Sequence, residues 1–395
     1  MRERYGIVVL LTIGVTLIVH AWIYGLWSLW WTDDDSASLV NTTGVSDVAK
    51  LSEDQKPQKI TYDLSSFETA LVDTVSRVKQ SVVSIVITKD LASYRLNSPL
   101  RFVPNDLPQK TVVGGWSGIF VHKDGYILTN KHVVEDPDAQ YSVIFSDGIT
   151  VTWKQVWMDP VLDIAVLRIA DLPAWVSMVP AQAISRDDEV SVWQFAIAIG
   201  NALAEYQNSV TLGIISWRNR SLGTQNKNLY AWLYQTDTPI NQWNSWGPLL
   251  DIRGRVIWIN TAVSAEWSNI GFAIPITQQF VDATIKSIQT YNKILRPFIG
   301  IQYADLNAQV AQELGVEQTK GIYVAEVVEG TAAALAGIKK DDVITAINGK
   351  VIDDEYPFLY QLYTFVPGDT VKLTVVRDGM PKEIQISLWK NDGTK

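Results

Sequence analysis

Cysteine is absent from the 395-residue sequence, and histidine occurs only three times. The absence of cysteine excludes disulfide bonds, thiol nucleophiles and Cys-ligated zinc. The net charge is −9 and the isoelectric point is near 5.0. Basic residues form no cluster larger than short pairs such as Lys339-Lys340. This acidic balance disfavours a nucleic-acid partner. The sequence has no His/Asp/Glu cluster with metal-ligand spacing, so we expect neither a metal site nor an organic cofactor.

Charged residues are also missing from the segment between Gly6 and Trp31. Because a bilayer needs about 20 apolar residues, this segment predicts a transmembrane signal-anchor helix over residues 6–31. Arg2 and Arg4 precede it and Asp33–Asp35 follow it. The positive-inside rule therefore places the N-terminus in the cytoplasm and the bulk of the chain outside the cell membrane. A cleaved signal peptide is the alternative, although the run exceeds the usual apolar core of about 7 to 15 residues.

Composition divides the rest of the chain into a linker and two folded units. Residues 32–64 are rich in Asp, Ser, Thr, Lys and Gln, which is typical of a flexible tether. Residues 65–285 open with a short amphipathic helix, and then carry β-branched runs between Gly, Asp and Asn turns, which predict antiparallel β-structure. These runs are SVVSIVI (81–87), YSVIF (141–145), DIAVLRI (163–169) and RVIWINTAV (255–263). A helix-prone segment, Thr277 to Leu295, then leads into a second compact unit at residues 290–391.

Three segments carry the residue types of nucleophilic serine catalysis. His132 lies in TNKHVV, Asp163 in LDIAVL and Ser245 in NQWNSWGPL. In such a site the imidazole takes the serine proton, a carboxylate fixes the tautomer of the imidazole, and backbone N–H groups stabilise the oxyanion. The other two histidines are poor candidates for the base, because one lies in the predicted span and the other in a predicted strand. From its segment alone, Asp163 could also be an ordinary aspartate at the start of a strand.

Five motifs make the chain resemble the HtrA (high-temperature-requirement) family of trypsin-like serine proteases. In family order they are GGWSGIFVHKDGYILTNKHVV, DPVLDIAVLRI, AIGNALAEYQNSVTLGIIS, QTDTPINQWNSWGPLLDIRGRVIWINTAV and NIGFAIP. The resemblance spans about residues 70–390. It implies a mainly β, chymotrypsin-like double β-barrel protease domain, with His132 as general base, Asp163 as its orienting group and Ser245 as nucleophile. It also implies a serine endopeptidase that cuts misfolded or regulatory proteins.

The C-terminal unit resembles the α+β PDZ domain of the same family. The resemblance rests on GTAAALAGIKKDDVITAINGKVI and PGDTVKLTVVRDG, while Phe298, Ile299, Gly300 and Ile301 match the carboxylate-binding loop. It implies that the domain binds C-terminal peptides along a sheet edge and thereby regulates the protease. One membrane span and one PDZ copy look most like the membrane-anchored, stress-sensing branch of the family, for which analogy implies a homotrimer.

The primary substrate pocket is also implied by this resemblance. Ile240, Ile270, Gly271 and Phe272 match the positions that line it in the family. They imply a preference for small or medium apolar side chains. Asp237 is the nearest acidic residue, but the family pattern places it in the strand that leads into the site and not in the pocket.

The chain departs from the family pattern at glycine positions. Trp243 and Trp246 flank Asn244-Ser245 where the family has glycine, and the N–H groups of Trp243 and Ser245 are implied to form the oxyanion hole. Strain in this loop would cost about 1 to 3 kcal/mol. Loss of one oxyanion donor would cost roughly 10² to 10³ in turnover. The other tryptophans at family glycine positions are Trp116, Trp193, Trp217, Trp258 and Trp267, to which we add Trp157, Trp232 and Trp389.

Sixteen tryptophans are too many to find buried faces and indole partners in this chain. The codons UGG and UGA differ by one base, and some bacterial lineages read UGA as glycine, whereas common alternative translation tables render it as tryptophan. We therefore hypothesise that most of these tryptophans are glycines in the cell. Genuine tryptophans would instead make the chain a catalytically inactive PDZ peptide-binding pseudoprotease. Trp22, Trp27, Trp30 and Trp31 stay undecided, because tryptophan is common at membrane interfaces.

Overall fold

The computed structural model describes most of the chain from residue 64 to residue 391. The described residues are 64–91, 94–98, 101–104, 109–153, 155–169, 179–201, 209–225, 228–241, 244–263 and 270–391. The predicted span, 6–31, and all but the last residue of the predicted linker, 32–64, lie outside them. No helix within the described ranges is long and apolar enough to cross a membrane.

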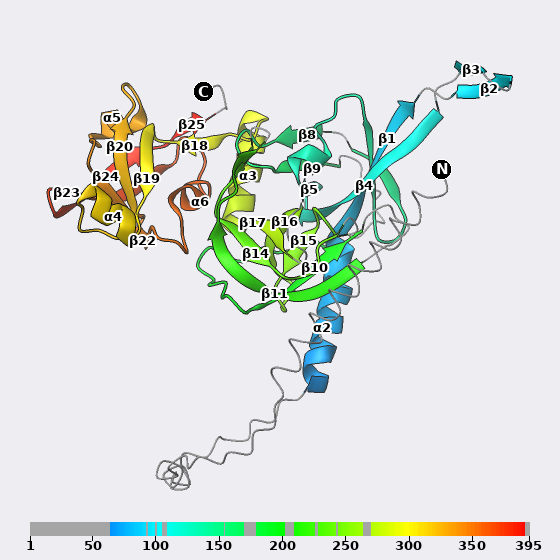
Figure 1. The fold of residues 1–395 in the computed structure, drawn as a ribbon, viewed down its shortest axis with the longest axis horizontal. Helices are drawn as coiled ribbons and strands as arrows, with labels where there is room; N and C mark the ends of the chain where they lie inside the picture. Colours follow the sequence, from blue (N-terminus) through cyan, green and yellow to red (C-terminus); the bar gives the residue numbers. More distant parts are fainter. Residues whose placement is uncertain are drawn as a thin grey trace, which may run out of the picture. The chain divides into compact units, whose positions relative to one another are not determined.

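An amphipathic helix, α2 (Leu64–Val78), begins the described chain (Figure 1). Its Leu71, Val75 and Val78 pack against the main hydrophobic core, as their helical spacing predicts. Thr74 on the same helix donates its hydroxyl to the carbonyl oxygen of Ile252 at 3.0 Å. The helix is thereby held to the folded domain by both apolar and polar contacts.

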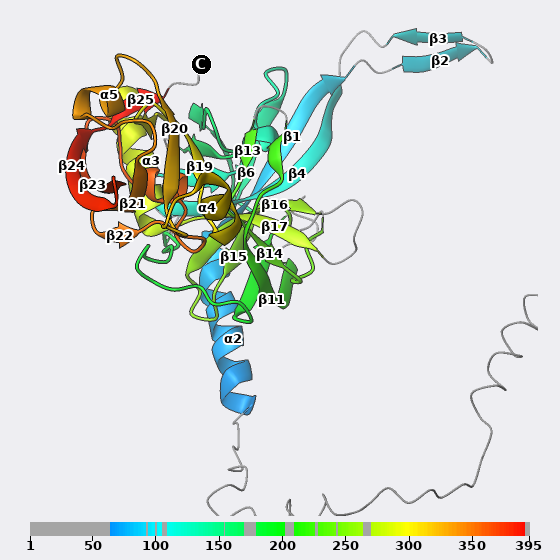
Figure 2. The ribbon, with the colours of Figure 1, turned by 60° about the vertical axis from the view of Figure 1, so that its left-hand side comes forward.

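The first sheet is antiparallel and has seven strands in the order β7-β6-β1-β4-β5-β9-β8. After the 3-10 helix η4 (Lys79–Ser81), its strands are β1 (Val82–Leu91), β4 (Gln109–His122), β5 (Tyr126–Thr129), β6 (Gln140–Ile144), β7 (Thr150–Thr152), β8 (Gln155–Met158) and β9 (Ala165–Arg168). Between β1 and β4 the chain forms the hairpin β2 (Tyr94–Ser98) and β3 (Arg101–Pro104), visible in Figure 2. A second 3-10 helix, η5 (Lys131–Val133), follows β5.

The second sheet is a closed barrel in the order β10-β11-β14-β17-β16-β15. Its strands are β10 (Phe195–Gly200), β11 (Ser209–Arg220), β14 (Leu233–Thr236), β15 (Pro248–Leu250), β16 (Val256–Val263) and β17 (Gly271–Pro275). A hairpin of β12 (Gly223–Gln225) and β13 (Asn228–Tyr230) stands between β11 and β14. Of the two barrels expected, the described residues show one as a closed barrel, and the other as an open seven-stranded sheet whose end strands β7 and β8 are not paired with each other.

The C-terminal unit begins after helix α3 (Gln278–Tyr291). The side chain of Thr277 caps the start of this helix, and Asn292 ends it at a left-handed φ of 53°. The unit contains the pair β18 (Arg296–Phe298) with β25 (Trp389–Asn391), and a sheet of β19 (Ile301–Asp305), β20 (Ile322–Val327), β21 (Val343–Ile347), β22 (Lys350–Val351), β23 (Thr370–Arg377) and β24 (Met380–Ser387). Its helices are α4 (Ala308–Leu314), α5 (Ala332–Ala336) and α6 (Phe358–Leu362).

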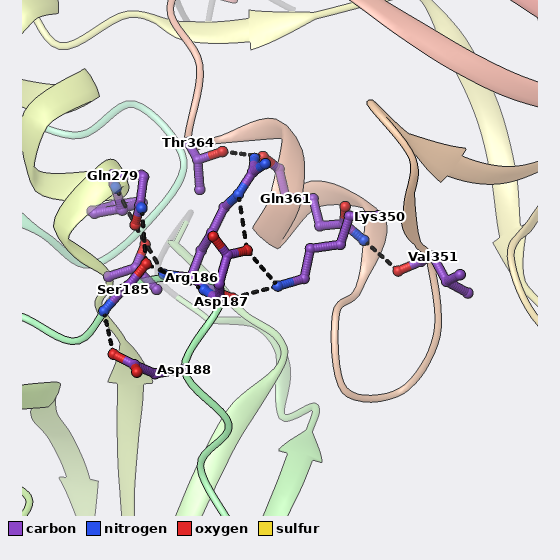
Figure 3. Close-up of polar contacts among 11 residues, drawn as sticks. Ser185, Arg186, Asp187, Asp188, Gln279, Lys350, Val351, Gln361 and Thr364 are labelled. Atoms are coloured by element: carbon purple, nitrogen blue, oxygen red, sulfur yellow. Dashed lines mark hydrogen bonds and ion pairs between the residues drawn. The ribbon is translucent and has the colours of Figure 1, made fainter.

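Polar contacts join the segment before β10 to the C-terminal sheet (Figure 3). Lys350 of β22 donates to the carbonyl oxygen of Arg186 and lies 3.3 Å from the carboxylate of Asp187. The backbone N–H of Arg186 donates to the side chain of Gln279 on α3 at 2.9 Å. One short segment is therefore bonded to both the helix that ends the protease region and the sheet that follows.

A buried ion pair ties β18 to the loop before β9. Arg296 and Asp159 are each 1% exposed, and Nε of Arg296 donates to Oδ2 of Asp159 at 2.7 Å. The guanidinium also donates to Thr284 at 3.1 Å. Oδ1 of Asp159 accepts the N–H groups of Val161 and Leu162, both at 2.9 Å. The pair therefore orders the loop that ends at Asp163.

We predict that Arg296→Met destabilises the chain by about 3 to 5 kcal/mol, because Asp159 stays buried without a counter-charge. The matched control is Lys286→Met, whose pair with Asp369 is exposed and should contribute less than about 1 kcal/mol. Urea unfolding followed by circular dichroism measures both changes. Equal unfolding midpoints for the two variants would show that the buried pair contributes no more to stability than the exposed pair.

Candidate active site

Strand pairing brings His132 and Asp163 together. Strand β5 runs antiparallel to β9, with Thr129 opposite Ala165, so the segment after β5 lies beside the segment before β9. His132 stands in η5 on the first segment, and Asp163 stands on the second. Nδ1 of His132 is 2.7 Å from Oδ2 of Asp163, and the backbone N–H of His132 donates to Oδ1 at 3.1 Å. The two predicted residues therefore form a side-chain pair.

Asp163 is fully buried and accepts several further hydrogen bonds. Its Oδ2 accepts from Thr261 at 3.0 Å, from the hydroxyl of Tyr230 at 3.1 Å and from the side-chain amide of Asn130 at 3.2 Å. The same amide of Asn130 also donates to the hydroxyl oxygen of Thr261 at 2.9 Å. Buried charge is tolerated where it is densely hydrogen-bonded, and this carboxylate meets that condition.

The environment of Asp163 favours its ionised form. Burial by itself would raise the pKa of this carboxyl group, but the hydrogen bonds and charge of His132, with help from Thr261, outweigh burial and hold the pKa below its ordinary value. The carboxylate is therefore available to accept the Nδ1 proton of His132. That arrangement leaves Nε2 of the imidazole as the nitrogen able to accept a proton from another group.

Ser245 lies in the turn that precedes β15 and is 8% exposed. Its hydroxyl donates to the carbonyl oxygen of Asn241 at 2.6 Å, and its backbone N–H donates to the same oxygen at 2.8 Å. Among the described residues no hydrogen bond joins Ser245 to His132. The candidate nucleophile and one candidate oxyanion donor are thus both directed at a single carbonyl group.

The indole of Trp246 covers one side of His132. Their ring centroids are 5.3 Å apart at 69°, and the Trp246 ring also meets Trp116 edge-on, with centroids 4.0 Å apart. Trp246 has a φ of 64°, a left-handed value that is unusual for a bulky side chain. Its buried indole N–H has no hydrogen-bond partner among the described residues. Trp243, the other implied oxyanion residue, lies outside the described residues.

Other tryptophans also occupy unfavourable surroundings. Trp193 has a φ of 74° and is 78% exposed, and Trp232 has a φ of 46°. Apart from these two and Trp246, the described non-glycine residues with positive φ are all Asn or Asp, whose side chains tolerate that conformation. Trp258 is fully buried, and its indole N–H has no hydrogen-bond partner in the part of the chain that the structure describes. Trp157 differs, because its indole N–H donates to Asn292 at 3.1 Å.

Two of the residues predicted to line the substrate pocket lie next to each other. Gly271 begins β17, and a Cβ placed there would come within 2.4 Å of the Ile240 side chain. Ile240 and Gly271 are therefore in direct contact, although they are far apart in sequence. Phe272 follows in the same strand, and Ile270 precedes it. Asp237 accepts the backbone N–H of Ile214 at 2.7 Å, so its carboxylate is engaged with β11.

The predicted carboxylate loop connects β18 to β19. Phe298 ends the first strand and Ile301 begins the second. Between them, the carbonyl of Ile299 accepts the N–H of Ala333 at 2.8 Å, and the loop turns at Gly300 with a φ of 89°. A Cβ at Gly300 would lie 2.3 Å from Thr331, so the turn requires glycine on both conformational and steric grounds. No group of three or more His, Asp or Glu residues that could hold a metal occurs in the described part of the chain.

Sequence reasoning missed three residues around Asp163, namely Asn130, Thr261 and Tyr230. Asn130 and Thr261 lie within quoted motifs, but nothing in those motifs distinguishes a residue that donates to a carboxylate from its neighbours. Tyr230 precedes the motif that contains Ser245, and no pattern in the sequence marks it as a functional residue. Only the pairing of the strands shows that these side chains converge.

The fold and site define a class of protein, and family models agree with it. A trypsin-like peptidase domain model matches residues 116–259, and a PDZ domain model matches residues 297–388. The chain is therefore a mainly β, trypsin-like peptidase domain followed by a PDZ domain.

Relatives narrow the class to a family. The chain is 37% identical over 366 residues to a probable periplasmic serine endoprotease DegP-like of Brucella suis, covering 81% of this chain and 69% of that protein. It is 32% identical over 335 residues to the periplasmic pH-dependent serine endoprotease DegQ of Escherichia coli, covering 81% and 70%. The solved structure of the HtrA-type protease AlgW with decapeptide is 30% identical with a TM-score of 0.57, covering 81% and 98%. This chain belongs to the HtrA family of serine endopeptidases, as its motifs predicted.

Proposed function

We propose that the chain hydrolyses peptide bonds in proteins through a His132, Asp163 and Ser245 triad. The single observation that carries this proposal is the 2.7 Å pair between His132 and the fully buried, ionised Asp163. In the first step, Nε2 of His132 takes the hydroxyl proton as Oγ of Ser245 attacks the substrate carbonyl. His132 then returns the proton to the leaving amine, and water hydrolyses the acyl-enzyme with His132 again as base.

The serine loop must change before that step. The hydroxyl of Ser245 has to leave the carbonyl of Asn241 and point toward His132. The backbone N–H of Ser245 has to leave the same carbonyl, so that it can join the N–H of residue 243 in stabilising the oxyanion. We therefore propose that activation releases both hydrogen bonds of Ser245 to the carbonyl oxygen of Asn241.

We also propose that residues 243 and 246, with most of the other tryptophans at family glycine positions, are glycines in the cell, read from UGA. The left-handed φ values of Trp193, Trp232 and Trp246 support this, because glycine adopts them without strain. The unpaired, buried indole N–H of Trp258 supports it as well, since such a group costs about 1 to 3 kcal/mol. The well-bonded Trp157 is the position that fits glycine least.

The other candidate function is an inactive, PDZ peptide-binding pseudoprotease. One observation favours it if the tryptophans are genuine. The indole of Trp246 packs against His132, and both hydrogen-bond donors of Ser245 are engaged with the carbonyl oxygen of Asn241. In that case the PDZ groove would remain the working part of the molecule.

The cellular setting follows from the sequence and from the named relatives. We propose one membrane-spanning helix at residues 6–31, a linker at 32–64, an extracytoplasmic protease domain at 65–285 and a PDZ domain at 290–391. The relatives described as periplasmic support an extracytoplasmic location. We further propose a homotrimer whose substrates are unfolded or regulatory proteins, with C-terminal peptides binding at the PDZ domain. The pocket of Ile240, Ile270, Gly271 and Phe272 would select small or medium apolar side chains.

The mass of the native peptide from Asn228 to Arg253 tests the identity of three tryptophans at once. We expect this peptide, isolated from the source cells, to have the mass of a chain with glycine at positions 232, 243 and 246. A full-tryptophan mass would reject the recoding proposal and favour the pseudoprotease. The peptide that contains Trp157 is the internal control, because its indole is hydrogen-bonded.

Serine-directed labelling tests catalysis. We expect a fluorophosphonate to label Ser245 in the full chain carrying Trp243→Gly and Trp246→Gly, roughly 10² times faster or more than in the chain as printed. Adding Ser245→Ala is the control and should abolish labelling. A folded glycine form that is not labelled would refute the endopeptidase proposal, and equal labelling of both forms would show that the tryptophans do not impair the site.

Peptide binding tests the role of the PDZ loop. We expect Gly300→Ala to weaken binding of a fluorescent peptide with an apolar, free C-terminus by about tenfold or more, because the added Cβ collides with Thr331 and reshapes the loop. Gly349→Ala is the matched control, since Gly349 has a similar φ of 81° but open space around it. Fluorescence anisotropy gives both affinities. Equal affinities for the two variants would place the peptide elsewhere.

A further inference from the structure

Tyr230 reaches the candidate active site from outside both sheets. It ends β13, the second strand of the small hairpin between β11 and β14. The hairpin is bonded to the loop before β9, because the N–H of Leu229 donates to the carbonyl of Val161 at 2.8 Å. At the next residue, the hydroxyl of Tyr230 donates to Oδ2 of Asp163 at 3.1 Å. Two successive residues of the hairpin thus hold the segment that carries the carboxylate.

We propose that Tyr230 is a positioning residue, which sets the orientation and effective charge of Asp163 and, through it, the basicity of His132. This inference rests on the proposed triad. Tyr230 does not touch the reacting atoms in this arrangement. It acts on Oδ2, the oxygen that also accepts Nδ1 of His132 at 2.7 Å.

The three donors to Oδ2 besides His132 differ in how they are held. Thr261 lies in strand β16 of the closed barrel, at a shift of register between Asn260 and Ala262, and Asn130 is fully buried directly before η5. Tyr230 is only half-buried and belongs to a hairpin of two short strands. Of the three donors, Tyr230 is the one whose position depends on the hairpin. The hairpin therefore acts directly on the carboxylate of Asp163 through the hydrogen bond of Tyr230.

Removing the hydroxyl has two consequences for the imidazole. A hydrogen bond to an ionised carboxylate is stronger than a neutral one and withdraws charge from the oxygen that accepts it. Without it, more negative charge faces the ring, and protonated His132 persists to higher pH. The carboxylate also loses one restraint on its orientation, so the imidazole is held less well for proton transfer.

The test is Tyr230→Phe in the full chain, studied both as printed and with Trp243→Gly and Trp246→Gly. In the glycine form we expect kcat/KM to fall about tenfold, mainly through kcat. The acidic limb of the kcat/KM profile should move to higher pH. A purely structural role would lower the fraction of folded enzyme and leave the position of that limb unchanged.

Two controls separate this role from general effects. Tyr291→Phe removes a hydroxyl that donates to the carbonyl of Pro367, and should leave rate and pH profile unchanged. Thr261→Val removes a second donor to the same oxygen, so combined with Tyr230→Phe it should give a non-additive loss. A Tyr230→Phe profile that coincides with that of the parent, with kcat/KM within about twofold, would overturn the proposal.

A readout that needs no turnover separates this inference from the proposed function. Labelling of Ser245 decides whether the chain is a working peptidase. Histidine enriched in ¹³C at Cε1 reports the protonation of His132 by NMR, and the chain has only three histidines to resolve. We expect Tyr230→Phe to move the titration of the His132 signal to higher pH in both forms of the chain. An unmoved signal rejects the role of Tyr230 even if Ser245 is active.

Discussion

The buried carboxylate of Asp163 is the group on which the rest of the site depends. An ionised group without water must be matched by donors, and those donors come from parts of the chain far apart in sequence. His132 follows β5, Thr261 lies in β16 and Tyr230 ends β13. The carboxylate can be satisfied only when both sheets and the hairpin are folded together. Assembly of the site and assembly of the domain are therefore the same event.

A second buried carboxylate, Asp159, holds the loop in which Asp163 lies. Its Oδ1 accepts the backbone N–H groups of Val161 and Leu162, while its Oδ2 meets Arg296 at the start of the C-terminal unit. Leu162 itself is 1% exposed, so the loop between the two aspartates is fixed by apolar as well as polar contacts. Breaking the ion pair would leave the carboxylate that holds these two backbone N–H groups buried without a counter-charge. The placement of Asp163 is consequently tied to the strand that opens the PDZ unit.

Sequence patterns predicted those features that depend on local order. The β-branched runs at 81–87 and 255–263 predicted strands that the structure has as β1 (Val82–Leu91) and β16 (Val256–Val263). Short motifs singled out His132, Asp163 and Ser245, and of these the structure brings His132 and Asp163 together. Three features could not be predicted: the hydrogen bond from Tyr230 to Asp163, the ion pair of Arg296, and the hydrogen bond from the hydroxyl of Ser245 to the carbonyl oxygen of Asn241. Each depends on which distant segments meet, or on which of several conformations a loop adopts. Local sequence periodicity determines neither of these properties.

Two tryptophans beside His132 give a separate argument about which residues fit this part of the backbone. Trp116 and Trp246 are far apart in sequence, yet their rings touch each other, and that of Trp246 also packs on the imidazole of His132. The family resemblance implies glycine at both positions, and two glycines would leave open space on that side of the imidazole. A peptide substrate must bring its carbonyl carbon between Ser245 and the oxyanion donors, and bulky indoles beside the imidazole oppose that approach. The left-handed φ of residue 246 argues in the same direction, because the backbone already adopts a conformation that glycine reaches without cost. The backbone conformation at position 246 and the access of substrate to the imidazole therefore both favour glycine there, for two unrelated physical reasons.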